Sequence, residues 1–475
     1  MSKPIKIILF VGGGFIVLVA LVAVVLLVFV DTDAYRTRVG TAASNALGME
    51  VRIAGSLGID LWPGLHITLE DVHLAQQGAE VASVEKVRLG IDLLPLLQKK
   101  IRIGTLALKH PRISIERDRD GKFNFEIKAP DSATEATPGW PQVSLTEGAL
   151  LFSDQRSGAG FEATDCSLKV DQRRPSGSKI AGLVRNLSFT AELACGEIRK
   201  NHLTLSAVKI SATGANGVID LKPATMRVFG APGSGSLHAD FSGDVPRYDI
   251  RFELPQFHVE EFFKTLSQQK VAAGTMDFSA DLSSQGKTLN EVKESVMGTV
   301  SLRGQNIKLL GRDLDAEFSR FESSQNFNLV DVGAFFVAGP LGLLVTKGYN
   351  FASILQGPGG SSEIRTLVSD WQVEGGIARA QDVALATDNH RVALKGGLDL
   401  VKEKFNDLTL ALIDNEGCTK VRQTLQGSFH DPQVEQPSVL RSLASPVEKI
   451  LQLGRDLFPG GECELFYSGS VAPPE

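Results

Sequence analysis

The chain has 475 residues, of which 43% are hydrophobic and 22% are charged, and its formal net charge is −6. This composition excludes an intrinsically disordered chain, and the length is enough for two or three domains with sizeable cores. Basic and acidic residues are interspersed, so no basic face is expected to neutralise nucleic-acid phosphates, and nucleic-acid binding is not predicted.

The first predicted element is a transmembrane helix at residues 5–30. Ile7 to Val30 contains no charged or strongly polar side chain, and as a helix it would extend roughly 36 Å, enough to cross a hydrocarbon core of about 30 Å. A cleaved signal peptide is the alternative, but its apolar region should be only about 7–15 residues long, and Thr32-Asp33-Ala34 is a poor cleavage site. The sequence therefore favours one retained anchor.

The side of the membrane follows less directly from the sequence. Basic residues flank the predicted helix on both sides, so the positive-inside rule hardly discriminates. A cytoplasmic stub as short as residues 1–4 is nevertheless typical of an uncleaved anchor. We therefore expect a single-pass protein of the bacterial inner (plasma) membrane, with the bulk of the chain in the periplasm.

The region from 31 to 135 begins with a predicted helix, Tyr35 to Leu47, because its apolar residues recur at helical spacing and Gly48 follows. From Val51 onward the period changes to two, which predicts short strands of an antiparallel meander with a hairpin turn at Asp120-Gly121. Alternating apolar residues of these strands are candidates for lining a hydrophobic groove: Leu65, Ile67, Leu69, Val87, Leu89, Ile91, Leu93, Ile101, Ile103, Ile113, Ile115, Phe123 and Phe125.

A stretch rich in Ser, Thr, Ala and Pro, Asp131 to Pro141, predicts the boundary to a middle β-rich region at 136–285. Strands are expected there from Val143 onward, interrupted by a helix at Val259 to Leu266. A third region, 286–475, follows. Its predicted elements are helices at 289–296, 314–322 and 447–457, strands between 299 and 310 and between 364 and 413, and a last strand at 465–471.

Leu329 to Val345 is a mostly apolar segment with Asp331 as its one charged residue and Gly339-Pro340 near its middle. A buried helix pair or core strand is favoured over a hairpin that touches the membrane or caps a groove. Its role stays open.

Four cysteines are present. Cys166 lies near Cys195 and Cys418 near Cys463 in the sequence, so two local disulfides are the simplest of three connectivities. Four free buried thiols are an equally good alternative, since sequence cannot place the sulfur atoms within bonding distance.

The common catalytic and cofactor motifs are missing from the sequence. No H-E-x-x-H or G-x-S-x-G occurs, and Gly286-Lys287-Thr288 lacks the first glycine of a P-loop because Asp281 replaces it. The acidic residues from Glu116 to Asp120 imitate an EF-hand loop, but Ile127 occupies the position of its closing carboxylate. We therefore predict no enzyme activity, no cofactor and no metal site.

The segments "VRIAGSLGIDLWPGLHITLEDVHLA" and "ASVEKVRLGIDLLPLLQKKIRIGTLALKHPRISIERDRDGKFNFE" lie between Val51 and Glu126. With the anchor and the short helix, they resemble the amino-terminal region of the AsmA family. Pro63-Gly64-Leu65, Leu94-Pro95-Leu96-Leu97 and the hairpin with Phe123-Asn124-Phe125 carry this resemblance; the family prefers Trp where Phe125 stands. The segment "VMGTVSLRGQNIKLLGRDL" is similar to the family's carboxyl-terminal region.

This resemblance implies an inner-membrane-anchored periplasmic protein with an elongated β-rich body, related to bridge-like lipid transfer proteins, and a role in outer-membrane maintenance. The expected fold class is mainly β with a few helices: an elongated antiparallel sheet that could curl into a hydrophobic groove. Closed β-sandwiches use the same alternation and stay an alternative. The partners expected are phospholipid or another envelope lipid; the alternative is a scaffold that assists outer-membrane protein biogenesis through envelope protein partners.

Overall fold

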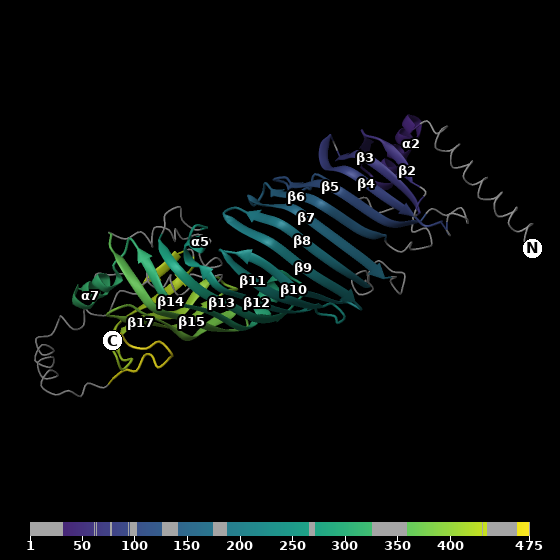
Figure 1. The fold of residues 1–475 in the computed structure, drawn as a ribbon. Coiled ribbons are helices and arrows are strands. Elements are labelled where there is room, and N and C mark those ends of the chain that lie inside the picture. The colour runs from purple at the N-terminus through teal and green to yellow at the C-terminus, as the bar shows by residue number, and fades with distance from the viewer. Residues whose placement is uncertain are drawn as a thin grey trace, which may run out of the picture. The chain divides into compact units, whose positions relative to one another are not determined.

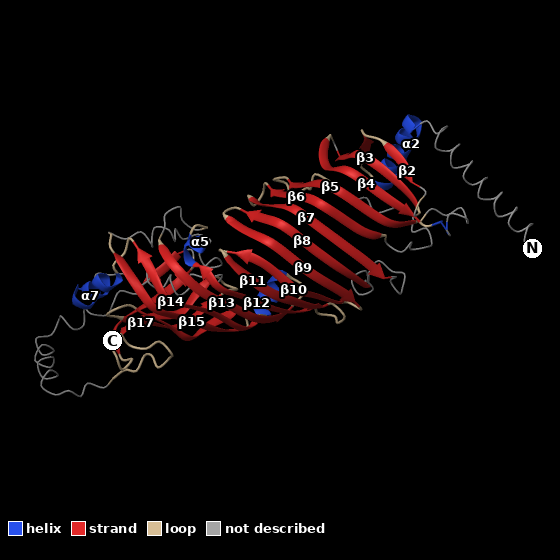
Figure 2. Cartoon of the chain, viewed as in Figure 1, coloured by secondary structure: helices blue, strands red, loops and turns tan. Residues whose placement is uncertain are grey.

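Strands dominate the computed structural model of the chain, and the few helices are short (Figure 2). It describes residues 32–60, 62, 64–76, 78–93, 95, 102–125, 141–173, 188–265, 271–324, 359–429, 431–434 and 463–474. The predicted mainly β fold is confirmed. None of the helices within these ranges is both long enough and apolar enough to cross a membrane, and the helix predicted at 5–30 lies outside them.

The chain divides into two compact units. The amino-terminal unit comprises Met1–Ile180 and Leu187–Lys200, and the carboxyl-terminal unit comprises Ala181–Asn186 and Asn201–Glu475. The division therefore falls near residue 200, whereas the regions predicted from the sequence meet near 135 and 285.

The described part of the amino-terminal unit is one layer of strands with a helix at its start (Figure 1). Strands β1 and β2 both pair with β3, and β3 to β8 then pair in chain order. The elements are α2 (Thr32–Leu47), β1 (Glu50–Ile53), β2 (Leu57–Asp60), β3 (Leu65–Gln76), β4 (Ala79–Ile91), β5 (Ile103–Arg117), β6 (Gln142–Asp154), β7 (Ala159–Arg173) and β8 (Ser188–Lys200).

One pair of strands in this unit differs from the predicted antiparallel meander. β5 and β6 pair in parallel, with Leu106 opposite Val143. The chain between their paired ends, from Arg117 to Gln142, is long enough to return to the starting end of β5, which a parallel connection needs and a tight hairpin cannot provide. The turn at Asp120-Gly121 does form, with Gly121 at φ +86°, but it leads only to an isolated bridge between Arg117 and Phe123.

Residues with a left-handed backbone conformation, meaning a positive φ, form a line across the sheet on β3, β5, β6 and β7. At each of these positions the strand contains one residue that breaks the two-residue alternation, so apolar residues of the same face are three apart there instead of two. Leu69 and Val72, for example, belong to one buried cluster. The left-handed residues and their φ values are Asp71 (52°), His110 (48°), Glu147 (56°) and Asp165 (53°).

The carboxyl-terminal unit is a second series of antiparallel strands, which pair in chain order from β9 to β20. Its strands are β9 (Leu203–Ala215), β10 (Val218–Val228), β11 (Ala231–Asp240), β12 (Arg247–His258), β13 (Ala272–Gln285), β14 (Met297–Leu310), β15 (Ser361–Glu374), β16 (Ile377–Ala386), β17 (Arg391–Asp399), β18 (Lys404–Ile413), β19 (Thr419–Ser428) and β20 (Asp431–Val434).

Helices α5 (Val259–Phe263), α6 (Leu289–Ser295) and α7 (Leu314–Ser324) interrupt these strands close to the predicted positions. The unit has a dense core to which α5 and α7 contribute: Phe262 of α5 is 2% exposed, and Leu314 and Phe318 of α7 are fully buried. On the first turn of α7, Asp315 accepts hydrogen bonds from Thr387 at 2.6 Å and from His390 at 2.7 Å. These contacts join α7 to the turn between β16 and β17.

Strands β15 to β18 are covered on their second face by the final segment, Cys463 to Pro474. Phe466, Tyr467 and Val471 of this segment pack against a buried row that includes Val368 and Ala393. The prediction of a strand at 465–471 is wrong: Leu465 forms only an isolated bridge to Cys418. The two following amides both donate to the carbonyl oxygen of Gly417, which turns the segment away from regular pairing.

Both local cysteine pairs are disulfides in the structure, Cys166 with Cys195 and Cys418 with Cys463. The first pair joins directly opposite residues of β7 and β8. The apolar segment Leu329 to Val345 and the helix predicted at 447–457 lie outside the described residues.

Candidate functional site

One face of the amino-terminal unit carries continuous rows of apolar side chains. Directly paired residues of neighbouring strands point to the same side of a sheet, so the strand register gives each row. Three rows cross the unit. They are Ile59, Ile67, Leu89, Leu106, Val143, Val170 and Ala191; then Leu57, Leu69, Val87, Leu108, Leu145, Leu168 and Leu193; and, beyond the line of left-handed residues, Leu74, Ala82, Ile113, Leu150, Ala163 and Ile198.

Most of these apolar side chains are only half-buried. Leu89, Leu108, Leu145 and Leu168 all fall in this intermediate class, whereas the core residues of the carboxyl-terminal unit are nearly inaccessible. A sheet that packed face to face against a second sheet would bury such a row fully. The face is therefore an apolar surface that water can reach in part.

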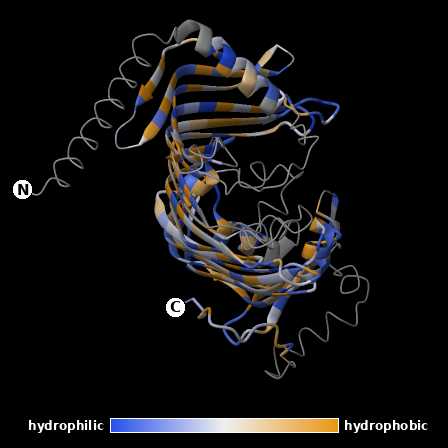
Figure 3. Cartoon of the chain, turned by 90° about the vertical axis from the view of Figure 1, so that its right-hand side faces the viewer, coloured by the Kyte–Doolittle hydropathy of each residue, from blue (hydrophilic) through white to orange (hydrophobic). Residues whose placement is uncertain are grey.

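The opposite face of the same strands is polar. Thr68, Arg88, Ala107, Ser144 and Lys169 form the register row next to the apolar row that contains Leu89. Hydrophobic and hydrophilic residues accordingly alternate along the strands (Figure 3). Each strand thus separates an apolar face from a hydrated one, as the two-residue period predicts.

The dimensions of the apolar face can be compared with those of a lipid. The row from Leu57 to Leu193 crosses seven strands, β2 to β8. With strands about 4.8 Å apart, it extends for roughly 29 Å. The chains of one bilayer leaflet occupy about half of a 30 Å hydrocarbon core. The row is thus longer than a single acyl chain of a membrane lipid.

A cavity of about 450 Å³ lies on β4 to β7, where Ala82, Ile113 and Leu150 of the third row are part of its lining. Most of the lining, however, belongs to register rows of the opposite face: Ser83, Arg112 and Ala149, and then Ser114, Leu151 and Glu162. The surface of the unit is therefore hollowed at this end of the strands.

Nine of the predicted lining residues fall on this face, among them Ile115, which is two residues after Ile113 on β5. Leu65, Ile91 and Ile103 are directly opposite one another in a short additional row. The remaining five stand in the three rows: Ile67, Leu69, Val87, Leu89 and Ile113.

The other predicted lining residues differ in their placement. Ile115, although on the same face as Ile113, is opposite Phe152, which is stacked on Phe161 with 5.5 Å between ring centroids. Leu93 follows β4 and is 54% exposed, and Phe123 is 48% exposed with its ring 5.9 Å from that of Phe125. Ile101 lies outside the described residues. Whether any of these side chains contacts lipid stays a prediction.

The sequence interpretation missed the contributions of β6 to β8 to the same face. Leu145, Leu168 and Leu193 continue the second row directly. Their strands were predicted, and their alternation was the available signal. It could not be assigned to the same face without the register of β5 and β6, whose parallel pairing the sequence did not reveal.

Charged residues gather where the line of left-handed residues reaches the polar side. His110 lies between two carboxylates, 2.5 Å from Glu85 and 2.7 Å from Glu147, and its hydrogen bond lowers the pKa of Glu85. His73 lies 2.8 Å from Glu80 and 3.0 Å from Asp71, and the hydrogen bond with Glu80 raises the pKa of His73. These contacts join neighbouring strands along the line of residues with positive φ.

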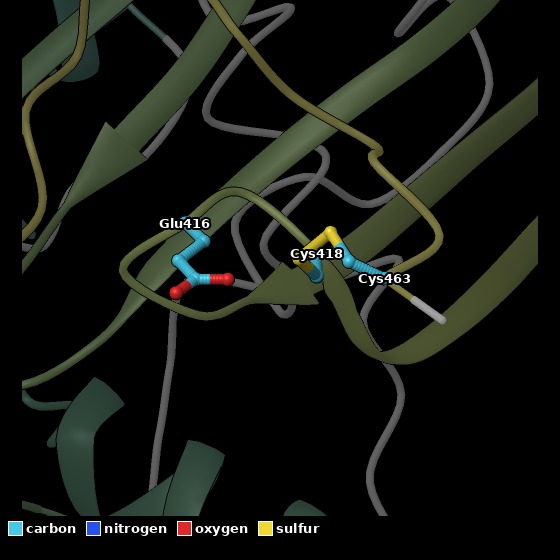
Figure 4. A group of neighbouring side chains, drawn as sticks. All are labelled: Glu416, Cys418 and Cys463. Atoms are coloured by element: carbon cyan, nitrogen blue, oxygen red, sulfur yellow. A yellow bond between two sulfur atoms is a disulfide. The ribbon is translucent and has the colours of Figure 1, made fainter. Parts of the chain in front are cut away.

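One group of potential metal ligands stands out among the described residues: Glu416, Cys418 and Cys463 (Figure 4). The two sulfur atoms are bonded to each other, and a disulfide has no thiolate to offer a metal. Glu416 is exposed. In the oxidised protein this group is a crosslink with a carboxylate beside it.

Residues 1–152 match the model of the AsmA family. This match confirms the resemblance predicted from the sequence, over the part of the chain that contains α2, β1 to β5 and nearly all of β6. No curated protein and no solved structure matches the chain.

Proposed function

Because residues 1–152 match the model of the AsmA family, we propose that the chain is a non-enzymatic, inner-membrane-anchored periplasmic protein of outer-membrane maintenance. Its role is to carry or conduct phospholipid along the apolar face of the amino-terminal unit. The observation that carries this proposal is the set of three apolar rows, with side chains that are still half-buried.

The free-energy cost of exposing an acyl chain to water favours the binding of lipid to this face. Each exposed CH₂ group costs about 0.8 kcal/mol, so a chain of fifteen carbons costs on the order of 12 kcal/mol in water. A row of partly exposed Leu, Ile and Val side chains has a similar free-energy cost per unit of exposed area until an apolar group covers it. An acyl chain laid along the row removes both surfaces from water together.

The polar face supports the same role. Glu70 and Lys86, 3.0 Å apart, and the neighbouring charges keep this side of β3 and β4 hydrated. Lipid would therefore be held on one side of the sheet only. The anchor predicted at 5–30 would hold the first strands near the membrane that supplies the lipid.

The test uses photocrosslinking of the full chain to a phospholipid with a photoreactive acyl chain. Leu145→Glu places a carboxylate in the middle of the second row, where an acyl chain could not solvate it. We expect at least a tenfold loss of labelling. Thr146→Glu is the matched control, because it adds the same charge at the next residue, which is exposed and opposite Lys109.

Both variants must keep the wild-type circular dichroism and the Cys166–Cys195 disulfide. Equal labelling of folded Leu145→Glu and wild type would contradict lipid binding at this face. Labelling lost equally in both variants would indicate a general effect of negative charge and would also count against the proposal.

A further inference from the structure

A pocket of about 630 Å³ lies in the carboxyl-terminal unit, between strands β16 to β18 and the final segment that covers them. We propose that this pocket is a binding site for a phosphate-bearing compound, which is either a free small molecule or a phospholipid headgroup. The site is on a different unit from the apolar rows and does not depend on their function.

The backbone itself opens the pocket. Arg379 pairs with Gly397 and Ala384 pairs with Ala393, but no regular pairing occurs between these two points. Gly396, in the interrupted stretch of β17, has a φ of +106°, and a Cβ atom there would stand 2.2 Å from the carbonyl oxygen of Asp407. A glycine is thus required where β17 passes this close to β18.

The covering segment is fixed in place by several independent contacts. The Cys418–Cys463 disulfide holds its beginning, and Arg391 donates a hydrogen bond of 2.9 Å to the carbonyl oxygen of Val471. Between them, the Tyr467 hydroxyl donates to Asp382 at 2.5 Å. A wall that is already ordered costs little entropy when a ligand arrives.

The chemistry of the lining favours an anion. Its charged residues are Arg379, Lys395 and Asp407, so the positive charges exceed the negative one. The Lys395 ammonium stands 4.9 Å from the centre of the Phe466 ring, which orients it at the wall of the pocket. Gln381, Asn406 and Ser468 add neutral hydrogen-bonding side chains, and such groups suit phosphate oxygens.

Two acidic residues outside the lining, Glu374 and Asp382, compete weakly for these cations. Glu374 is 3.3 Å from Arg379, but their side chains are 74% and 55% exposed, and such a surface pair contributes little. Asp382 already accepts hydrogen bonds from Tyr467 and Ser470. Neither carboxylate therefore prevents Arg379 and Lys395 from binding a ligand phosphate. The volume of the pocket is also within the range of small-molecule sites.

The experiment is calorimetric titration of the full chain in a non-ionic detergent with inorganic phosphate, glycerol 3-phosphate and dihexanoyl phosphatidylglycerol. We expect at least one of these to bind, and Lys395→Gln combined with Arg379→Gln to weaken that binding at least tenfold, because two charge-assisted contacts are lost. Lys308→Gln is the matched control: Lys308 is an exposed lysine of β14 outside the pocket.

Dependence on the two cations with either water-soluble phosphate would assign the site to a free compound. The same dependence with the lipid alone would assign it to a headgroup, and either result supports the pocket as the site. The absence of binding in all three titrations would overturn the proposal. So would equal binding by wild type and a double variant whose thermal unfolding is unchanged.

Discussion

Asp382 shows how one carboxylate joins the end of the chain to the sheet. It accepts hydrogen bonds from the Tyr467 hydroxyl and from the backbone and side chain of Ser470. Burial alone would raise the pKa of Asp382, but the hydrogen bonds from Ser470 and Tyr467 and the positive charge of Arg303 lower it overall. Burial and the bond to Asp382 raise the pKa of Tyr467 far above its usual value.

Asp382→Asn should therefore destabilise the protein at neutral pH, by about 1–3 kcal/mol for the weakened hydrogen bonds. Because the folded-state pKa of Asp382 is lowered, its contribution is present above the unfolded pKa of about 3.9 and is lost as the pH falls through the folded value. Denaturant unfolding of wild type and variant should differ at pH 7 and converge in acid.

The phenol provides a second readout for this contact. With the carboxylate gone, the pKa of Tyr467 should fall but stay above its ordinary value, since burial remains its largest cause. Ultraviolet titration against Tyr467→Phe, which removes this one of four tyrosines, isolates the signal. An unchanged phenol titration would mean that Asp382 is not its partner.

At the scale of elements, the sequence predicted the strands well and their connections less well. The alternation from Leu65 to Leu69 and from Val87 to Ile91 identified β3 and β4, because a half-buried strand imposes a period of two. The helix at α7 was identified from the spacing of Leu314 and Phe318, which both face the core. These are local properties, so a single sequence can show them.

Local sequence patterns could not predict the line of left-handed residues. Asp71, His110, Glu147 and Asp165 adopt positive φ values although none is a glycine, and a positive φ is uncommon for any other residue type. Because of this line, Leu108 and Pro111 share one face although they are three residues apart. A fixed period of two would assign them to opposite faces. The candidate site was therefore predicted as residues, and its continuity across β6 to β8 came only from the register.

The disulfide-linked final segment offers a prediction at the scale of an element. Cys418 and Cys463 are separated by 45 residues, so the loop-entropy model assigns their crosslink roughly 4 kcal/mol. Replacing both with serine should speed amide hydrogen exchange at Phe466 and Tyr467 by at least tenfold, because the remaining hydrogen bonds must hold the segment alone.

The double replacement of Cys166 and Cys195 is the matched control, since that disulfide joins β7 to β8 in the other unit. It should leave exchange at Phe466 and Tyr467 unchanged. If the Cys418 and Cys463 variant also exchanged as slowly as wild type, the hydrogen bonds and the packing of Val471 would be sufficient, and the disulfide would be dispensable for holding the segment.

At the scale of the whole molecule, the two units share the alternation of apolar and polar residues but differ in how far their apolar faces are buried. In the carboxyl-terminal unit α5 and α7 belong to the apolar core, and residues such as Leu309, Ile364 and Leu385 are fully buried. In the amino-terminal unit the corresponding side chains of the second row, such as Leu145 and Leu168, are half-buried. The first arrangement stabilises a fold, whereas the second leaves apolar surface available.

This contrast predicts where lipid should change the protein. Amide exchange slows when a ligand stabilises the folded state of the unit that binds it. Adding a phospholipid to the lipid-free full chain should therefore slow exchange in β4 to β8, and the half-buried rows should respond most. The core strands β14 to β17 should change by less than twofold, because their apolar face is already filled. Leu145→Glu should abolish the slowing while Thr146→Glu retains it; slowing confined to β14 to β17 would place lipid on the other unit and contradict the proposed site.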